Sequence, residues 1–143
     1  MSDKMRWRYG DTNPVDVPIE SETVIEIGDL LWQDTDGKAK PASMMSPRET
    51  PMATRIAFAD RFLGVAMQRS RSGNRALPRV ATTGVFDFEC PKDTFRLGDL
   101  IAVDTDSDDR PCSQRVLRVG HFDRWQRSAI ARAAKVEPEP SET

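Results

Sequence analysis

Carboxylates at alternate positions form the most metal-like motif in the sequence. Asp104, Asp106 and Asp108 follow one another in the stretch DTDSD, and the first ligands of a calcium-binding loop have this spacing. Asp109 stands where such a loop requires glycine, and Arg115 where it requires a bidentate glutamate. Aspartate and threonine also favour turns, because they accept hydrogen bonds from nearby backbone N–H groups. We therefore interpret DTDSD as a turn and expect no metal and no cofactor, with a calcium-dependent domain as the weakest alternative.

Residues that could support catalysis are few and isolated. His121 is the only histidine, whereas a catalytic triad needs a histidine beside a nucleophile and an orienting acid. The sequence contains no nucleophile elbow, Walker loop or dinucleotide fingerprint. Cys90 and Cys112 form no CxxC pair, and we interpret them as reduced thiols in small half-buried sites. The sequence therefore predicts a protein that is not an enzyme.

Length and composition limit the other functional classes. A chain of 143 residues forms one domain, and 38% hydrophobic with 31% charged residues indicates a thin core. The net charge of −2 argues against nucleic acid as a partner. Because no apolar run approaches the roughly 18–20 residues needed to cross a bilayer, we expect no membrane association. The N-terminal stretch MSDKMRWRYGD lacks the apolar region of a secretory signal.

One stretch of the sequence occurs twice. Gly28–Pro41 reads GDLLWQDTDGKAKP, and Gly98–Pro111 reads GDLIAVDTDSDDRP, at a constant offset of 70. A repeat of this kind indicates one supersecondary unit used twice. Apolar and polar residues alternate before each Gly-Asp, which is the period of a strand with one exposed face. Each copy therefore predicts a strand, a bend at the glycine, a second strand and a turn.

The remaining elements are predicted from local patterns. Asp123–Lys135 is ambiguous, because its alanine and arginine content favours a helix whereas the repeat requires a strand after the second copy. The other expected elements are strands at Phe62–Gln68, at Val80–Cys90 with a bend at Gly84, and at Gln114–Val119, and a helical turn or two at Ala53–Arg61.

These elements predict an all-β, mainly-β protein with a possible short helix or two, built as a small β-barrel or β-sandwich around the duplicated strand-Gly-Asp-strand unit. Residues 1–23 are expected to form an extended N-terminal arm, because Asn13-Pro14 and Val17-Pro18 favour extended backbone. Residues 24–136 form the single β-rich domain, with its two copies at 24–68 and 94–136. Residues 137–143 are expected to be a disordered acidic tail.

Two stretches could bind a partner. The arm carries Trp7 and Tyr9 and could lie against another subunit, although an edge strand of its own sheet is an equally good interpretation. Residues 61–79 contain five arginines and no acid, which predicts either a solvated basic loop or a contact with an acidic surface. The hypothetical interface residues are Trp7, Tyr9, Asn13, Pro14, Val15, Val17, Ile19, Arg69, Arg71 and Arg75.

Several segments in order resemble one known family. RYGDTNPVDVPI, VIEIGDLLWQDTDGKAKPAS, AFADRFLGVAMQRSRSG, VATTGVFDFEC and FRLGDLIAVD together resemble the capsid cement, or head-decoration, proteins of tailed phages, over roughly residues 8–104. The sequence departs from the family's usual pattern at His121–Arg127.

The resemblance implies a compact β-barrel or β-sandwich that binds the outside of a phage head and stabilises the lattice of the major capsid protein. It implies the major capsid protein as partner, a homotrimer of this chain, synthesis in the bacterial cytoplasm and a final place on the capsid exterior. It also implies that the arm around Trp7–Ile19 faces the lattice. The alternative function is a non-catalytic β-barrel module that binds a carbohydrate or small ligand, marked by an aromatic-lined pocket around Trp32, Phe86 or Trp125.

Overall fold

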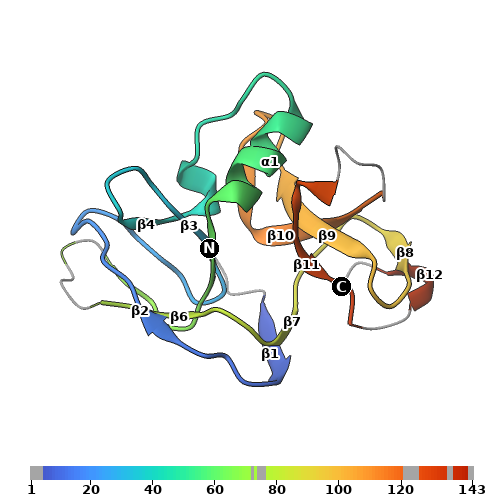
Figure 1. The fold of residues 1–143 in the computed structure, drawn as a ribbon, viewed down its shortest axis with the longest axis horizontal. Helices are drawn as coiled ribbons and strands as arrows, with labels where there is room; N and C mark the ends of the chain where they lie inside the picture. Colours follow the sequence, from blue (N-terminus) through green and yellow to red (C-terminus); the bar gives the residue numbers. More distant parts are fainter. Residues whose placement is uncertain (1–4, 72, 74–76, 121–125, 135–136, 142–143) are drawn as a thin grey trace.

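The computed structural model describes residues 5–71, 73, 77–120, 126–134 and 137–141 (Figure 1). The described strands form four sheets, with strand orders β2-β6-β5-β3-β4, β10-β9-β11, β1-β7 and β8-β12. The predicted mainly-β class is confirmed, whereas no closed barrel is found among these strands.

The elements are β1 (Arg6–Tyr9), β2 (Val15–Asp16), β3 (Leu30–Gln33), β4 (Ala39–Pro41), a 3₁₀ turn (Ala42–Met44), α1 (Pro51–Asp60), β5 (Phe62–Ala66), β6 (Arg79–Ala81), β7 (Val85–Asp87), β8 (Asp93–Phe95), β9 (Leu100–Thr105), β10 (Pro111–Val119), β11 (Ala129–Arg132) and β12 (Glu137–Ser141).

The two copies share a bend at Gly-Asp and the hairpin after it. The strand expected before the glycine is present in the second copy as β8, whereas the first copy has only an isolated bridge between Ile25 and Ser70 there. Gly28 and Gly98 both have positive φ, +95° and +83°, a conformation that glycine adopts without the steric cost of a Cβ. The aspartates that follow, Asp29 and Asp99, each accept a hydrogen bond through Oδ2 from the backbone N–H three residues earlier, at 3.0 and 2.8 Å. Each Gly-Asp is therefore a tight turn that leads into an antiparallel hairpin, β3-β4 or β9-β10.

The repeat also decides the ambiguous segment near the C-terminus. Ala66, at the end of β5, exchanges backbone hydrogen bonds with the first Gly-Asp turn at 2.8 and 2.9 Å. Ala133 exchanges the same pair with the second turn, at 2.9 and 2.8 Å. Within the described part of 123–135, residues 129–132 therefore form strand β11 rather than a helix, and β11 pairs with β9 as β5 pairs with β3. The ladder hydrogen bonds outweigh the weak helical preference of the alanines.

The hairpin turns differ although their sequences match. In the first copy the N–H of Asp34 donates to the carbonyl four residues later, at 3.0 Å. In the second copy Asp106, and not the aligned Asp104, makes the same bond at 2.9 Å. The positive-φ position is Gly37 (+80°) in one turn and Asp109 (+61°) in the other. The second hairpin is thus longer, and Asp104 lies inside strand β9.

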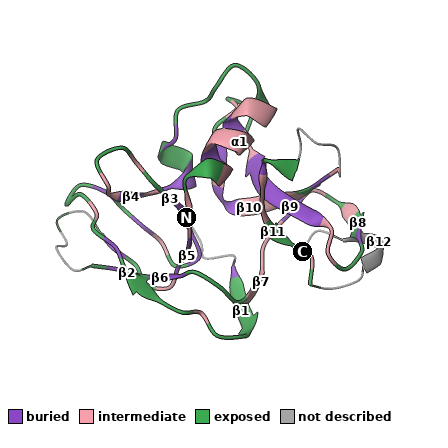
Figure 2. Cartoon of the chain, viewed as in Figure 1, coloured by how far each residue is buried: buried purple, intermediate pink, exposed green. Residues whose placement is uncertain are grey.

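Helix α1 confirms the short helix expected at 53–61. It begins after Thr50, whose side chain accepts a hydrogen bond from the N–H of Ala53 at 3.1 Å, with Pro51 in the first turn. In Figure 1 the helix lies across β9 and β11, between the two copies. Phe58 is fully buried and packs in the main core with Leu30 and Val103. Figure 2 shows this buried strip along β3, β9 and the inner side of α1.

Glycine divides the strand expected at Val80–Cys90. Gly84 has a φ of +128°, and the chain bends there between β6 and β7. β6 pairs with β5 and β2, whereas β7 pairs with β1. The bend predicted from the sequence is therefore present, and it sends one continuous stretch into two different sheets.

The described strands nearest the two ends of the chain pair with strands of the same chain. β1 pairs with β7 and β2 with β6, which is the edge-strand interpretation of the arm. The structure corrects the disordered tail expected at 137–143, because Glu137–Ser141 forms β12 against β8. The prolines of this segment alternate with residues that retain an N–H, so an edge strand can keep its donors on one side.

Candidate binding surface

β1 exposes the two aromatic residues predicted to bind a partner. All four of its residues are exposed, with 51% of Trp7 and 59% of Tyr9 accessible to solvent. Trp7 donates through Nε1 to the carbonyl of Gly10 at 3.3 Å, which holds the indole along the surface. Among the described strands, β1 pairs with β7 alone. Tryptophan and tyrosine are the residues most enriched at the centres of protein interfaces.

The structure separates the other residues of the arm into two groups. Asn13, Pro14 and Val15 are exposed, and Asn13 donates to the hydroxyl of Thr83 at 2.8 Å. Val17 is only 6% exposed.

Val17 and Ile19 pack into the chain's own second core cluster, together with Ile25 and Leu31. The side chain of Val17 therefore fills the apolar face of its own sheet and leaves little surface for a partner.

The basic stretch is partly neutralised within the chain. Arg69 forms an ion pair with Glu26 at 2.6 Å, and Arg79 lies 3.9 Å from Asp16. Arg71 is exposed, whereas the predicted Arg75 lies outside the described residues. Because these partners come from distant parts of the sequence, local charge counting overstated the basic character of this loop.

The acidic turn makes internal contacts. Asp104 is 9% exposed and binds Arg115 at 2.8 Å, with Arg55 at 3.9 Å. Oδ1 of Asp106 accepts the backbone N–H groups of Asp108 and Arg110 at 2.9 and 3.0 Å. In the described part of the chain, no three His, Cys, Asp or Glu side chains gather as metal ligands. These carboxylates therefore act as turn and ion-pair acceptors.

The two cysteines are both free thiols, as predicted. Cys90 is buried and Cys112 is half-buried. Burial, reinforced by the nearby carboxylates of Asp104 and Asp106, raises the pKa of Cys112 to about 11. A thiol with this pKa is a poor nucleophile at neutral pH, because the thiolate is the reactive form.

Trp32 belongs to the core of the β3-β4 hairpin and does not line the apolar pocket described below. It is buried and donates through Nε1 to the carbonyl of Pro41 at 3.0 Å. The ammonium of Lys40 lies 5.9 Å from the centre of its ring and binds the carboxylate of Asp34. This hydrogen bond lowers the pKa of Asp34 and raises the pKa of Lys40.

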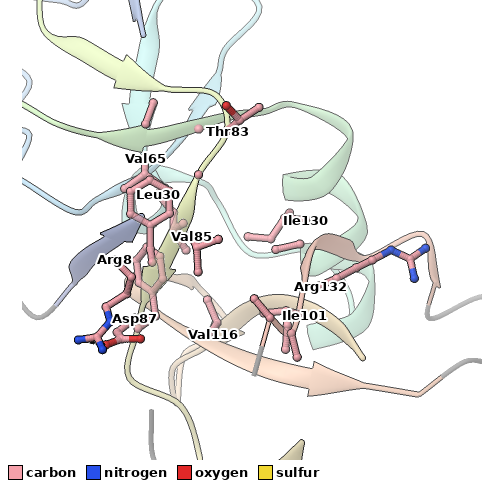
Figure 3. A pocket seen from close by; sticks show the side chains of 18 of the residues that line it. Arg8, Leu30, Val65, Thr83, Val85, Asp87, Ile101, Val116, Ile130 and Arg132 are labelled. Atoms are coloured by element: carbon pink, nitrogen blue, oxygen red, sulfur yellow. Dashed lines mark ion pairs between the residues drawn. The ribbon is translucent and has the colours of Figure 1, made fainter. Parts of the chain in front are cut away.

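An apolar pocket of about 460 Å³ opens between the two copies. Phe86, one of the three aromatics named for a ligand pocket, lines it, whereas Trp125 lies outside the described residues. Figure 3 shows Val85, Ile101, Val116 and Ile130 around the hollow. The other lining residues include Phe62, Phe88, Phe95, Ala131, Ala133 and Ala134.

Charged side chains lie at the rim of this pocket. Arg8 forms an exposed ion pair with Asp87 at 3.6 Å on one side, and Arg132 lies on the other side (Figure 3). Arg132 is exposed and donates to the carbonyl of Gly98 at 3.3 Å. The rim therefore has two cations and one anion.

Sequence reasoning missed most of the pocket because its walls come from distant segments. The available signal was the alternation of Phe86 and Phe88 with Asp87 and Glu89. Both rings are only half-buried and lie 6.3 Å apart, so this strand places apolar surface where no element of the described chain covers it fully.

Comparisons of the chain with family models, curated proteins and solved structures found no match. The part of the chain that the structure describes has no helix that is both long and apolar enough to cross a membrane.

Proposed function

We propose that this protein is a capsid decoration protein that binds the outside of a phage head and stabilises the lattice of the major capsid protein. The observation that carries the proposal is β1, a fully exposed strand that presents Trp7 and Tyr9 and that pairs, among the described strands, with β7 alone. The resemblance over residues 8–104 and the mainly-β fold support it.

The physical argument concerns how a small surface can stabilise a large shell. β1 offers backbone hydrogen bonds to an added strand, and its two aromatics provide large contact area at low cost in side-chain entropy. One such contact is smaller than the roughly 1,000 Å² expected of a stable independent interface. A homotrimer that binds through three copies of β1 gains affinity from its high effective concentration. Contacts repeated over equivalent positions on a lattice then resist the separation of neighbouring capsid subunits.

The test measures binding to capsids of the phage that encodes the chain, prepared without this protein. We expect the Trp7→Ala/Tyr9→Ala variant to bind more than tenfold more weakly in co-sedimentation, since truncation of interface hot spots costs about 2 kcal/mol or more. The wild-type protein is also expected to raise the temperature at which these capsids open. Leu97→Ala is the matched control, because Leu97 is 67% exposed and lies outside β1. Undiminished binding by the double variant would contradict the role of β1, and no capsid binding by the wild type would contradict the function.

The second candidate function is a non-catalytic module that binds a carbohydrate or small ligand. The pocket lined by Phe86 favours it, and its size falls within the roughly 300–1,000 Å³ of small-molecule sites. The lining is mostly apolar, which suits an apolar ligand better than a glycan. A glycan array and a panel of apolar ligands, each repeated with Phe86→Ala, would test it; binding lost in the variant supports this function.

A further inference from the structure

The sheets built by the two copies of the repeat differ in their number of strands. In the first copy β5 is followed in the sheet by β6 and then β2, giving the order β2-β6-β5-β3-β4. In the second copy β11 takes the place of β5, and the order β10-β9-β11 ends there. No described residue pairs with the outer edge of β11. The position that β6 occupies in the first copy is therefore vacant in the second copy of the described chain.

The hydrogen bonds of the first copy show which groups this vacancy leaves free. Ala66 points its N–H and carbonyl toward the Gly-Asp turn, and the next residue, Met67, donates outward to the carbonyl of Arg79 in the β6 strand at 2.9 Å. Ala133 points toward the second Gly-Asp turn in the same way. Because backbone direction alternates along a strand, the N–H groups of Arg132 and Ala134 face outward. Ala134 is the counterpart of Met67, and its N–H is placed to donate to an added strand.

The apolar pocket runs along this outer edge. Consecutive residues 130–134 form one wall, and Val85 and Phe86 of β7 line the pocket as well. Ile101 and Val116 line it from β9 and β10 (Figure 3). The vacant position is thus a recess with apolar sides and hydrogen-bonding groups along one wall. These are the two features by which a sheet edge binds an extended peptide, since backbone bonds give affinity and side-chain pockets give selectivity.

We propose that the free edge of β11 binds an extended acidic segment of a partner protein as an added antiparallel strand, in the position that β6 holds in the first copy. The segment that fills the equivalent position, Arg79–Ala81, buries Val80 and Ala81, so the occupant has small or β-branched residues at these two positions. The occupant has an acid in place of Arg79, because the rim carries two arginines, Arg8 and Arg132, and one acid, Asp87. Asp87 already forms an ion pair with Arg8, so an added acid would complement Arg132.

The geometry favours a single strand over a second copy of this chain. β11 faces a recess that β7 also lines, so the edge of another folded sheet would have to displace β7 to reach it. A bulge between Ala129 and Ala131 also interrupts the regular edge of β11, and such bulges oppose pairing with an arbitrary strand. This inference does not depend on the partner being a capsid protein.

The test uses the full chain and a synthetic peptide. The probe is the chain's own segment 76–84 with Arg79→Glu, and a scrambled peptide is the control. Amide hydrogen exchange of the free, dilute protein is expected to show a protected Ala133 and fast exchange at Arg132 and Ala134. With the peptide at about ten times its Kd, exchange at Arg132 and Ala134 is expected to slow roughly tenfold, because exchange then proceeds only from the small fraction of chains that remain unbound.

Two variants separate strand addition from other modes of binding. Ala134→Pro removes the outward N–H at an edge, where proline is tolerated, and is expected to weaken peptide binding about fivefold, the value of one hydrogen bond. Arg132→Glu reverses the rim charge, so the peptide that retains Arg79 is expected to bind about two- to fivefold more tightly than the Arg79→Glu peptide, the scale of an exposed ion pair. Both variants are checked for wild-type exchange at Ala133, which reports the β9-β11 ladder.

Three results would overturn the proposal. Protection of Ala134 in the dilute free chain would show that the edge is already closed. Protection that increases with protein concentration, without peptide, would identify a second copy as the occupant. Binding of the peptide or of an apolar probe without protection of Arg132 and Ala134 would show that the pocket binds side chains or small ligands and adds no strand.

Discussion

Gly28 and Gly98 occupy the same position in the two copies, so alanine substitution at each separates two contributions to stability. Both have positive φ, and an L-residue in the left-handed region costs roughly 1–2 kcal/mol. A Cβ at Gly98 has no heavy atom within 4 Å apart from those of its two neighbours in the chain. A Cβ at Gly28 lies 2.6 Å from Cβ of Met5 and 3.3 Å from Oε1 of Gln114. Gly98→Ala therefore reports the backbone term alone, whereas Gly28→Ala adds a steric clash.

The extra loss of stability in Gly28→Ala depends on which atom the new Cβ contacts. Met5 is only 6% exposed, and its Cβ cannot rotate away because it is fixed to the backbone. The clash is relieved only when the backbone that enters β1 moves. Overpacking of this kind costs about 1–3 kcal/mol. We expect a loss of about 1–2 kcal/mol in the free energy of unfolding for Gly98→Ala, and a further loss of about 1–3 kcal/mol for Gly28→Ala.

Equilibrium unfolding in urea measures both losses. Met5→Gly removes the atom that clashes, so Met5→Gly combined with Gly28→Ala is expected to show a favourable coupling energy of about 1 kcal/mol or more. Met5→Gly combined with Gly98→Ala is the matched control and is expected to be additive within about 0.5 kcal/mol. Met5→Ala is unsuitable as a rescue, because it keeps the Cβ.

Equal losses for Gly28→Ala and Gly98→Ala, within about 0.5 kcal/mol, would refute this reasoning. They would mean that the segment before β1 does not pack against the first Gly-Asp turn. The position of β1 at the surface would then need another explanation, and with it the exposure of Trp7 and Tyr9 on which the proposed function depends.

Three further predictions concern single groups. In a Cys90→Ser background, Cys112 is expected to react with iodoacetamide at pH 8 about a hundredfold more slowly than a thiol of pKa 9.0, because burial raises its pKa to about 11; reaction at the rate of a free thiol would contradict this. The hydrogen bond from Lys40 lowers the pKa of Asp34 below 3.8, so its contribution to stability is present above pH 3.8 and is lost as pH falls through the folded-state value. Asp34→Asn is therefore expected to flatten the decline of unfolding free energy below pH 3.8, and an unchanged slope would count against the pair. Thr50→Ala is expected to cost about 1 kcal/mol by removing the cap of α1, with Thr50→Ser retaining most of it; a loss below about 0.3 kcal/mol in urea unfolding would argue against the cap.

Local patterns in the sequence predicted the elements that local chemistry controls. The offset of 70 between Gly28 and Gly98 predicted a bend at each glycine followed by a strand and a turn, because positive-φ glycine and a turn aspartate act within three residues. The bend at Gly84 and the helix after Thr50 follow from chemistry of the same range. Within Asp123–Lys135 the repeat favoured a strand and residue propensity favoured a helix, so the sequence alone left this segment open.

Tertiary structure decided which partner each strand takes and which side chains remain at the surface. Val17 and Val15 belong to the same extended stretch, yet only Val17 meets the apolar face formed by Ile25 and Leu31. The composition of residues 137–143 predicted disorder, whereas Glu137–Ser141 forms a strand because the edge of β8 tolerates its prolines. The pocket and the vacant edge of β11 lie between segments more than forty residues apart in the sequence. The sequence by itself determined the glycine bends, the cap of α1 and the repeat, because residues a few positions apart fix them. Packing between the two copies determined the surface, because the exposure of a side chain depends on segments from elsewhere in the chain.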